Sequence, residues 1–488
     1  MSEDMEVKRT INSVVGVEHF GTKIVLPADP RKMEKREAAK ILVKAADQEE
    51  QFVDFSRKFE GYEPHDVGVH FSRVCKQFFG LVVSQTAVVE GMFGPMRVPP
   101  EVISFKTDVN ETETIILGQF VLPGINGTVN TQITQERGEK KPRYFQLTAE
   151  IMQKDRDLLD DFCNLIEASV KHNSVFKGKQ FDYRARDDDG DFLKIPQITF
   201  LNLEKVIMPI FDDDVQEKLE VSIYTPIQKT AQWLDAGLPL KRGCLLYGPF
   251  GTGKTLTAYT VAKMCRENNW TFIMCSHPEE FGETLRLARN YQPCVVFQED
   301  IDRLTSGGRT VQMDEILNII DGIESKDSQI MVIVTTNAYD DINKAMLRAG
   351  RLDARINIPL PNAVTVGRLL RSYGGNMINP NEDISEACKI LANLVTASEV
   401  AEVVTLAKGA AIRNDTYIDG KIVLTAKSLT YGATIVREQC DRNTEEKEST
   451  LSNQEKAAHV LAAALEKHID STKQTQPDFS NGHAAVIS

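Results

Sequence analysis

The sequence lacks several features that identify particular classes of protein. Its eight cysteines form no C-x-x-C pair and show no metal-like spacing, which argues against a structural zinc site. No apolar stretch approaches the roughly 20 residues that a membrane-spanning helix needs. No H-E-x-x-H motif of a zinc protease occurs in the chain. We therefore expect buried, reduced thiols and a cytoplasmic protein.

An excess of positive charge is also missing. Lys and Arg number 57 against 70 Asp and Glu, which gives a formal net charge of -13. A surface of this sign repels nucleic-acid phosphates and anionic lipid headgroups. The first six residues, Met-Ser-Glu-Asp-Met-Glu, also lack the basic-then-apolar order of a signal peptide. Nucleic acid and membranes are therefore not the partners that we expect.

What is present is the composition of a globular protein with several domains. The 488 residues are 42% hydrophobic and 26% charged, which suits about three domains of roughly 150 residues each. The pattern of apolar runs and turn residues divides the chain into a flexible arm at 1–18, an α+β N-terminal region for a substrate or partner at 19–200, a large α/β region at 201–360, a small helical region at 361–440 and a polar tail at 441–488.

The N-terminal region shows helical and then strand-like patterns. A cap at Asp29 and approximately helical spacing of apolar residues predict a first helix that ends at Gly61. A second helix is expected at 65–79. Short β-rich runs separated by turn residues predict an antiparallel meander between 102 and 151, and a further helix is expected at 156–172.

The strongest motif is Gly248-Pro-Phe-Gly-Thr-Gly-Lys-Thr255, which satisfies G-x-x-x-x-G-K-[ST]. It follows an apolar run at 244–247 that suits a buried strand, and it precedes a segment at 256–265 that can continue as a helix. In such a loop, backbone N–H groups surround the phosphates, the lysine neutralises phosphate oxygens and the Thr hydroxyl binds magnesium. A glycine-rich turn without chemistry is the alternative. The motif predicts an ATP and Mg²⁺ site whose contacts are Gly248, Pro249, Gly251, Thr252, Gly253, Lys254, Thr255 and Leu256.

Paired acids follow a second apolar run, at 294–298. They are Glu299 and Asp300, and parallel sheets place ligands at this end of their strands. A P-loop enzyme needs one carboxylate near the metal and another to orient the attacking water. We assign Glu299, with Thr255, to magnesium and Asp300 to water activation, although a small shift of the strand would exchange the two roles. Asp302 is expected to be a cap or a surface charge.

A third segment completes the pattern, with a strand at 330–336 that ends at Asn337. The P-loop, the acidic strand and the run at 335–353 together resemble the AAA family of ATPases, and this run resembles the family's second region of homology. The resemblance implies a P-loop parallel sheet sandwiched by helices, with a C-terminal helical lid and the α+β domain in front. It also implies that Asn337 is the sensor that helps hold the attacking water. Arg351 then matches the arginine finger, which reaches the neighbouring subunit's site.

The lid resembles the family as well, because residues 396–413 look like its lid helix. The resemblance implies that the small residues Ala397 and Ser398 approach the nucleotide. Without it, this segment is an amphipathic helix with no assignable chemistry.

Several departures from the family pattern stand out. Most members read Asp-Glu where this chain reads Glu299-Asp300, so the catalytic carboxylate is a shorter aspartate. The family's second arginine is replaced by Ala354. We expect Arg355 either to substitute for it or to pair with a surface acid.

The segment that normally carries the substrate-gripping pore loop is short. Phe281-Gly282 is its aromatic-glycine pair and our candidate for gripping polypeptide, against ordinary core packing, and 305–310 is a candidate second loop. The inverted acids, the short segment and the β-rich region upstream resemble the mitochondrial Rieske-protein translocase branch of the family.

These patterns predict an ATPase that forms a homo-hexameric ring and uses ATP and Mg²⁺ to remodel, disassemble or translocate a protein client bound by residues 1 to about 200. A nucleotide-dependent switch or scaffold with little turnover is the alternative, and Asp300 and Ala354 keep it open. A nucleic-acid motor is a further alternative, which the acidic balance disfavours.

Overall fold

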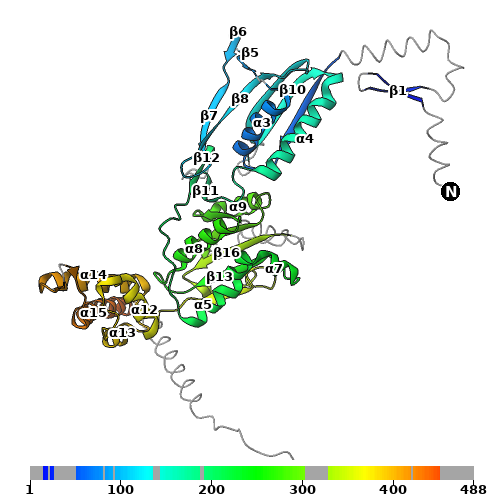
Figure 1. Ribbon diagram of the computed structural model, residues 1–488. Coiled ribbons are helices and arrows are strands. Elements are labelled where there is room, and N and C mark those ends of the chain that lie inside the picture. Colours follow the sequence, from blue (N-terminus) through cyan, green and yellow to red (C-terminus); the bar gives the residue numbers. More distant parts are fainter. Residues whose placement is uncertain are drawn as a thin grey trace, which may run out of the picture. The chain divides into compact units, whose positions relative to one another are not determined.

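A computed structural model gives the fold and describes residues 15–19, 22–26, 51–80, 83–91, 94–135, 143–186, 192–302, 328–418 and 421–450. The chain divides into two compact units (Figure 1). The second unit consists of Ile210–Asp212, Pro249–Thr252 and the residues from Pro359 onward, and the first unit holds the rest. We describe each unit by itself.

The N-terminal part of the first unit is built on a six-stranded antiparallel sheet, and this confirms the predicted meander. Two further hairpins, β1 (Val15–His19) with β2 (Thr22–Leu26) and β5 (Ala87–Gly91) with β6 (Gly94–Val98), stand outside it. The strand order of the sheet is β3 (Phe52–Phe59), β10 (Arg143–Met152), β9 (Gly127–Gln135), β8 (Thr112–Val121) and β4 (Val83–Gln85), with β7 (Glu101–Lys106) paired to β8.

Two of the predicted N-terminal helices are present and one is not. Helices α3 (Pro64–Phe79) and α4 (Arg156–Asn173) confirm the predictions at 65–79 and 156–172. The predicted helix ending at Gly61 is wrong over its last part, because Phe52–Phe59 is strand β3, and its earlier residues lie outside the described part of the chain. Side chains of β3 alternate between exposed and more buried positions, as in a strand with one covered face.

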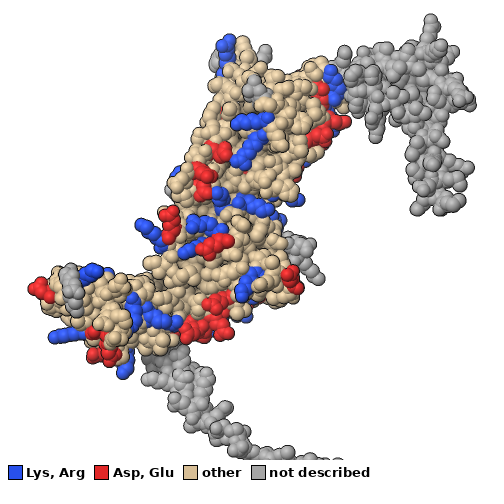
Figure 2. Space-filling model, viewed as in Figure 1, with Lys and Arg blue, Asp and Glu red and all other residues tan. Residues whose placement is uncertain are grey.

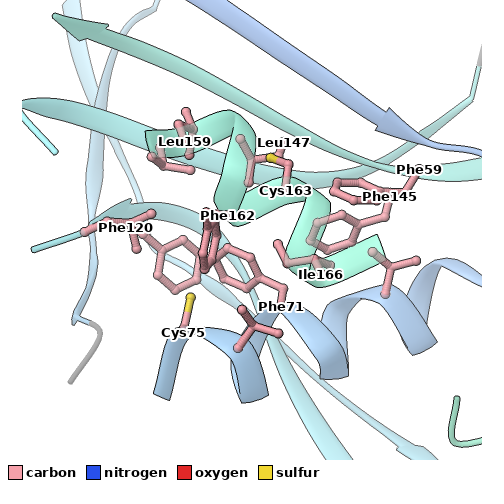
Figure 3. Packing of buried hydrophobic residues seen from close by; sticks show 14 of the residues in the cluster. Phe59, Phe71, Cys75, Phe120, Phe145, Leu147, Leu159, Phe162, Cys163 and Ile166 are labelled. Carbon is pink, nitrogen blue, oxygen red and sulfur yellow. The ribbon is translucent and has the colours of Figure 1, made fainter. Parts of the chain in front are cut away.

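Helices α3 and α4 pack their aromatic side chains against this sheet (Figure 3). The Phe71 ring of α3 lies 5.0 Å from the Phe120 ring of β8 and 6.0 Å from the Phe162 ring of α4. Phe145 of β10 is fully buried in the same cluster. The N-terminal part of the chain therefore has a hydrophobic core of its own.

The second sheet has seven strands and is parallel except at one edge. Its central strands are completely buried, which explains why the sequence shows them as continuous apolar runs. The strand order is β12 (Phe192–Phe200), β11 (Gln180–Arg186), β14 (Thr271–Cys275), β15 (Cys294–Gln298), β16 (Ile330–Thr336), β13 (Arg242–Tyr247) and β17 (Ala354–Asn357), and only β12 runs antiparallel to its neighbour.

Helices accompany this sheet, as the P-loop fold class requires. Helix α8 contacts β14 and β11, α9 contacts β14 and β15, and α5 contacts β17. The helices are α5 (Asp213–Leu219), a π-helical turn at Glu220–Tyr224, α6 (Thr225–Gln228), α7 (Thr230–Asp235), α8 (Lys254–Glu267) and α9 (Phe281–Ala288), and short 3-10 turns lie at Gln153–Asp155, Pro278–Glu280 and Tyr339–Asp341.

Strands β11 and β12 come from before residue 200, where the sequence divided the N-terminal region from the α/β region. Phe181 of β11 pairs in parallel with Ile273 of β14, so backbone hydrogen bonds join this hairpin to the second sheet. The carboxylate of Glu280 also accepts bonds from the backbone N–H groups of Ala185 and Arg186, each at 2.7 Å. Strands β11 and β12 therefore belong structurally with the α/β sheet.

The second unit contains the predicted C-terminal helices. The helix expected at 396–413 is α14, which begins with a capping box made by Thr396 and Glu399. Its apolar face is buried against α12 and α15. The elements are α12 (Ala363–Gly374), a 3-10 turn at Gly375–Met377, α13 (Ser385–Leu391), α14 (Ala397–Arg413), the hairpin β18 (Tyr417–Ile418) with β19 (Lys421–Ile422), and α15 (Ala426–Thr450), which continues past the predicted start of the tail at 441.

The cysteines follow the expectation drawn from their spacing. All eight are free thiols and all but Cys440 are buried. Burial raises the pKa of Cys75 and of Cys163 to about 12, so these thiols stay protonated and unreactive near neutral pH. Within the described ranges, we find no helix with the length and apolarity to cross a bilayer.

Candidate functional site

The glycine-rich loop lies between β13 and α8, where the sequence places it. Gly251 has a φ of 74° and Gly253 a φ of 103°, a region that side-chain-bearing residues rarely adopt. Gly248 has a φ of 151°, and a β-carbon there would lie 2.1 Å from the carbonyl oxygen of Ile358. The loop therefore needs its glycines, both for its turns and for a close backbone approach.

Lys254 is the first residue of α8 and is 7% exposed. Its ammonium group donates to the carbonyl oxygen of Gly248 at 2.7 Å, so the side chain folds back over the loop that it follows. Burial lowers the pKa of Lys254, and the charges of Asp300 and Asp302 oppose this effect. A cation is thus held at a helix N-terminus, close to two acids, in a loop of backbone N–H groups. This arrangement suits an anionic phosphate ligand.

Thr255 and Glu299 come together from different elements. Thr255 lies in the first turn of α8, and Glu299 directly follows β15. The Thr255 hydroxyl donates a hydrogen bond to Oε1 of Glu299 at 2.5 Å. A hydroxyl and a carboxylate are hard oxygen donors, which is the ligand type that Mg²⁺ prefers. These residues fit a magnesium ion, and Leu256 follows them in the same helical turn.

Asp300 and Asn337 meet because β15 and β16 are adjacent and parallel. The Asn337 side-chain amide donates to Oδ1 of Asp300 at 3.0 Å. Two residues after Asp300, Oδ1 of Asp302 accepts a hydrogen bond from the buried Thr336 hydroxyl at 2.7 Å. Asp302 was expected to be a cap or a surface charge. The structure instead ties it to the strand that carries the sensor candidate.

The two candidate arginines, Arg351 and Arg355, come after β16 in the sequence. The Arg351 guanidinium donates to the carbonyl oxygen of Ala345 at 2.7 Å. The Arg355 guanidinium lies 3.4 Å from the Tyr339 hydroxyl. The Tyr339 ring in turn lies 4.4 Å from the ring of Tyr247, the residue before the glycine-rich loop.

Within the second unit, the start of α14 contacts the loop segment Pro249–Thr252. Both the backbone N–H and the hydroxyl of Ser398 donate to the carbonyl oxygen of Gly251, at 3.4 and 3.3 Å. A β-carbon on Gly251 would lie 3.0 Å from Oγ1 of Thr396. The Thr252 hydroxyl donates to the carbonyl oxygen of Pro249 at 2.9 Å. Ala397 is the first residue of α14, so both small lid residues sit at the loop.

The pore-loop candidate is not available for gripping a polypeptide. Phe281 is fully buried in the core of the second sheet, where it begins α9. Phe281 therefore has the role given by the alternative, ordinary core packing: it is the first residue of α9 and its side chain is part of the hydrophobic core. The second candidate loop at 305–310 lies outside the described residues.

The sequence reasoning missed polar residues inside the strands. Gln298 and Thr335 are buried, and each bonds to the backbone of the acid pair. Thr336 is buried as well and holds Asp302. The only sequence pattern that points to them is a polar side chain at the end of an otherwise apolar run. Both β15 and β16 show this pattern.

Comparisons with known proteins match the part of the chain that carries these residues. The family model of the ATPase family associated with various cellular activities (AAA) matches residues 244–360. The 26S proteasome regulatory subunit 10B of Dictyostelium discoideum is 33% identical over 219 residues, which cover 41% of this chain and 55% of that protein. The 26S proteasome regulatory subunit 10B homolog A of Arabidopsis thaliana is also 33% identical, over 41% of this chain and 54% of its own length.

The similarity is confined to part of each protein. The chain spans about half the length of the curated relatives that it matches. The similarity to the mitochondrial Rieske-protein translocase branch stays a prediction. The family model covers most of β13, the glycine-rich loop, the acid pair, Asn337 and both arginines in one stretch, and the described strands around them form the parallel sheet that this motif requires. Residues 244–360 therefore carry the sequence and the fold that are typical of the AAA family of ATPases.

Proposed function

We propose that the chain hydrolyses ATP, and that a homo-hexameric ring of such chains uses hydrolysis to remodel, disassemble or translocate a protein client. The observation that carries this proposal is the meeting of two pairs at one edge of the sheet. Thr255 contacts Glu299, and Asn337 contacts Asp300. A metal ligand pair and a water-orienting pair close to the glycine-rich loop are what P-loop hydrolysis requires.

The loop and Lys254 would bind the phosphates. Backbone N–H groups of the loop offer hydrogen bonds, and the Lys254 ammonium can exchange its bond to Gly248 for phosphate oxygens. Because Lys254 is buried, its charge is screened little by solvent and acts strongly on the bound anion. Within the second unit, Ser398 at the start of α14 bonds to Gly251, and we propose that Ala397 and Ser398 approach the nucleotide there.

Thr255 and Glu299 would hold magnesium. When bound, the ion neutralises negative charge on the phosphate oxygens. Glu299 is already engaged with Thr255, which leaves Asp300 to accept a hydrogen bond from the attacking water. Asn337 fixes the Asp300 carboxylate by its amide and offers a second polar group at the same place. This division of labour supports the assignment of the metal to Glu299 and of the water to Asp300.

A ring places a second chain next to each site. AAA ATPases typically assemble as hexamers, and in this chain Arg351 is the residue proposed to reach the neighbour's phosphates. Arg355, held near Tyr339, would assist it. The sheet with α3 and α4 forms a separate core ahead of the ATPase sheet, which suits a role in client binding. We propose a cytoplasmic site of action.

Steady-state ATP hydrolysis by the full chain tests the proposal. Wild type should be active, and Lys254→Ala should lose nucleotide binding and activity. Asp300→Asn should lower kcat by about a hundredfold or more while ATP still binds. Asp235→Asn, which changes an exposed acid of α7, should remain active.

A magnesium titration separates the two acids. Glu299→Gln should raise the Mg²⁺ concentration needed for half-maximal activity, whereas Asp300→Asn should leave it unchanged. The reverse pattern would exchange the two roles. Nucleotide binding without turnover in the wild type would overturn hydrolysis and favour the switch or scaffold, the reading that the short Asp300 and Ala354 keep open.

A nucleic-acid motor is the weaker candidate. On the face drawn in Figure 2, basic and acidic side chains are interspersed, and the chain carries a net charge of -13. A backbone-tracking groove needs clustered positive charge. Salt-sensitive stimulation of hydrolysis by single-stranded nucleic acid would support this reading.

A further inference from the structure

Asp300 adopts a backbone conformation that is unusual for a residue with a side chain. Its φ is 46°, in the left-handed region, directly after β15. This conformation is uncommon for a non-glycine residue, although aspartate enters it more readily than most, and it persists where the surroundings hold it in place. The strained residue is the one whose carboxylate we propose to act on water. The surroundings that enforce its conformation are therefore part of the site.

Thr335 of β16 holds the N–H side of this residue. Its hydroxyl accepts a hydrogen bond from the backbone N–H of Asp300 at 3.1 Å. Its carbonyl oxygen accepts from the next N–H, that of Ile301, at 2.9 Å. Two successive N–H groups thus converge on one residue, which an extended strand cannot do because its N–H groups alternate in direction. Thr335 is 3% exposed, so water does not compete for these bonds.

Gln298 holds the other end of the same peptide group. It is fully buried, and its side-chain amide donates to the carbonyl oxygen of Glu299 at 2.6 Å. The carbonyl of Glu299 and the N–H of Asp300 belong to a single planar peptide unit. That unit is therefore clamped at both ends, by Gln298 from β15 and by Thr335 from β16. The orientation of this peptide unit fixes the position of the Asp300 backbone nitrogen, from which the φ rotation of Asp300 begins.

The side chain of Asp300 is fixed separately, by Asn337 at 3.0 Å. Thr335 and Asn337 are two residues apart on the same strand end, so one segment controls both the backbone and the carboxylate. An aspartate is shorter than the glutamate of most family members by one carbon–carbon bond, about 1.5 Å. Turning the backbone is a way to redirect a carboxylate that cannot be lengthened.

We propose that Thr335 and Gln298 are positioning residues for ATP hydrolysis. By clamping the Glu299–Asp300 peptide, they hold Asp300 in the left-handed conformation that its carboxylate requires. This inference rests on the proposed function. Neither residue touches the nucleotide, and both act through Asp300.

The test compares two substitutions of one hydroxyl. Thr335→Val removes the acceptor at almost unchanged volume and should lower kcat by about ten- to a hundredfold, because a misplaced group loses its near-attack geometry. Thr335→Ser keeps the acceptor and should restore activity close to the wild type. The binding stoichiometry and Kd of a fluorescent ATP analogue, measured with Mg²⁺, should be unchanged in both. An unchanged stoichiometry shows that the loss of kcat is not a loss of folded sites.

A matched control uses another buried threonine. The Thr284 hydroxyl of α9 donates to the carbonyl oxygen of Glu280, the residue before that helix, and Thr284→Val should leave kcat unchanged. Gln298→Met removes the second clamp and should lower kcat in the same direction, which keeps the inference testable if Thr335→Val does not fold. Asp300→Gly, which can adopt the same conformation without strain, should unfold at a higher denaturant concentration than Asp300→Ala.

The outcomes are distinguishable. An active wild type with full activity in both Thr335→Val and Gln298→Met would overturn this inference alone. Equal losses of kcat in Thr335→Val and Thr335→Ser would also overturn it, because the acceptor would then not matter. A wild type that binds ATP without hydrolysing it would overturn the proposed function, and this inference with it.

Discussion

A β-carbon on Gly243 would lie 1.6 Å from the carbonyl oxygen of Arg351 and 2.5 Å from its carbonyl carbon. Gly243 is near the start of β13, and Arg351 lies just before β17, which pairs with β13. The backbone of the proposed arginine finger thus rests directly on a strand that leads into the glycine-rich loop. The absence of a side chain at residue 243 sets the position of Arg351.

We expect Gly243→Ala to displace Arg351 and to disturb the β13–β17 pairing. The loss of stability should be about 1–3 kcal/mol, as for other overpacked sites, together with a loss of ATPase activity. Urea unfolding and steady-state hydrolysis measure the two effects. Gly409→Ala is the control, because a β-carbon there meets nothing within 4 Å and an alanine should stabilise α14 by up to about 1 kcal/mol. Wild-type stability and activity in Gly243→Ala would contradict the expectation.

If each site is completed by a neighbour, two inactive variants should complement each other. Lys254→Ala lacks the phosphate-binding cation and Arg351→Ala lacks the finger, so a mixed ring contains some interfaces with both residues intact. Mixing should recover part of the ATPase activity, as measured across a range of mixing ratios. Arg348→Ala, an exposed arginine three residues earlier, should be active alone. Failure of rescue, with no self-association at any concentration tried, would rule out a shared site.

Tyr291 links the N-terminal helix to the segment that precedes β15. Its hydroxyl donates to Oδ2 of Asp66 at 3.2 Å and accepts from the backbone N–H of Glu63 at 3.1 Å. Tyr291→Phe leaves both groups buried without this partner and should cost about 1–3 kcal/mol in urea unfolding. Tyr417→Phe, at an exposed tyrosine, is the control. Equal stability of the two variants would show that the hydroxyl contributes nothing at this joint.

Glu283 should make stability depend on pH. Burial raises the pKa of its carboxyl, and the charge of Arg286 opposes this effect. A raised pKa in the folded state means that the folded chain holds the proton longer than the unfolded chain, whose value is near 4.5. Stability from this group is therefore present below 4.5 and lost as pH rises through the folded-state pKa.

Glu283→Gln removes this titration. The variant should gain stability relative to the wild type as pH rises from about 4.5 to about 7.5, by about 1.4 kcal/mol for each tenfold difference in proton affinity between the two states. Urea unfolding at several pH values measures the difference. Glu267→Gln, at an exposed acid that ends α8, should show no such trend. A constant difference between wild type and Glu283→Gln across this range would contradict the expectation.

The parts of the fold that the sequence predicted are those where a single pattern dominates. Strands β13 to β16 are continuous apolar runs because both faces of the sheet are covered, and the glycine-rich loop has few conformations compatible with its motif. The helix at 396–413 was predictable from its period and its cap at Thr396.

Strand β3 was missed because a charged residue occupies its covered face. Val53, Phe55 and Phe59 alternate toward the helices, but Arg57 stands among them and breaks the apolar pattern. Its guanidinium bonds to Glu167 of α4 at 2.8 Å, a contact between residues far apart in sequence. No local pattern predicts such a partner.

Strand β11 was missed for a different reason. Its buried residues, Phe181, Tyr183 and Ala185, do alternate, but charged residues lie between them and the strand shows no continuous apolar run. In the site, the chemistry-bearing residues were predictable from their motifs, whereas the clamp of Gln298 and Thr335 was not. This clamp depends on the register between β15 and β16, which cannot be predicted from the sequence.

The parallel pairing of β11 with β14 decides where a shortened protein can begin. A fragment that starts at residue 201 would lack two strands of the sheet, so that β14 would become an edge strand with unpaired backbone N–H and C=O groups. Such edges pair with other chains, and the fragment should aggregate. A fragment that starts before Gln180 keeps strands β11 and β12 and should not aggregate. An ATPase fragment should therefore begin before Gln180.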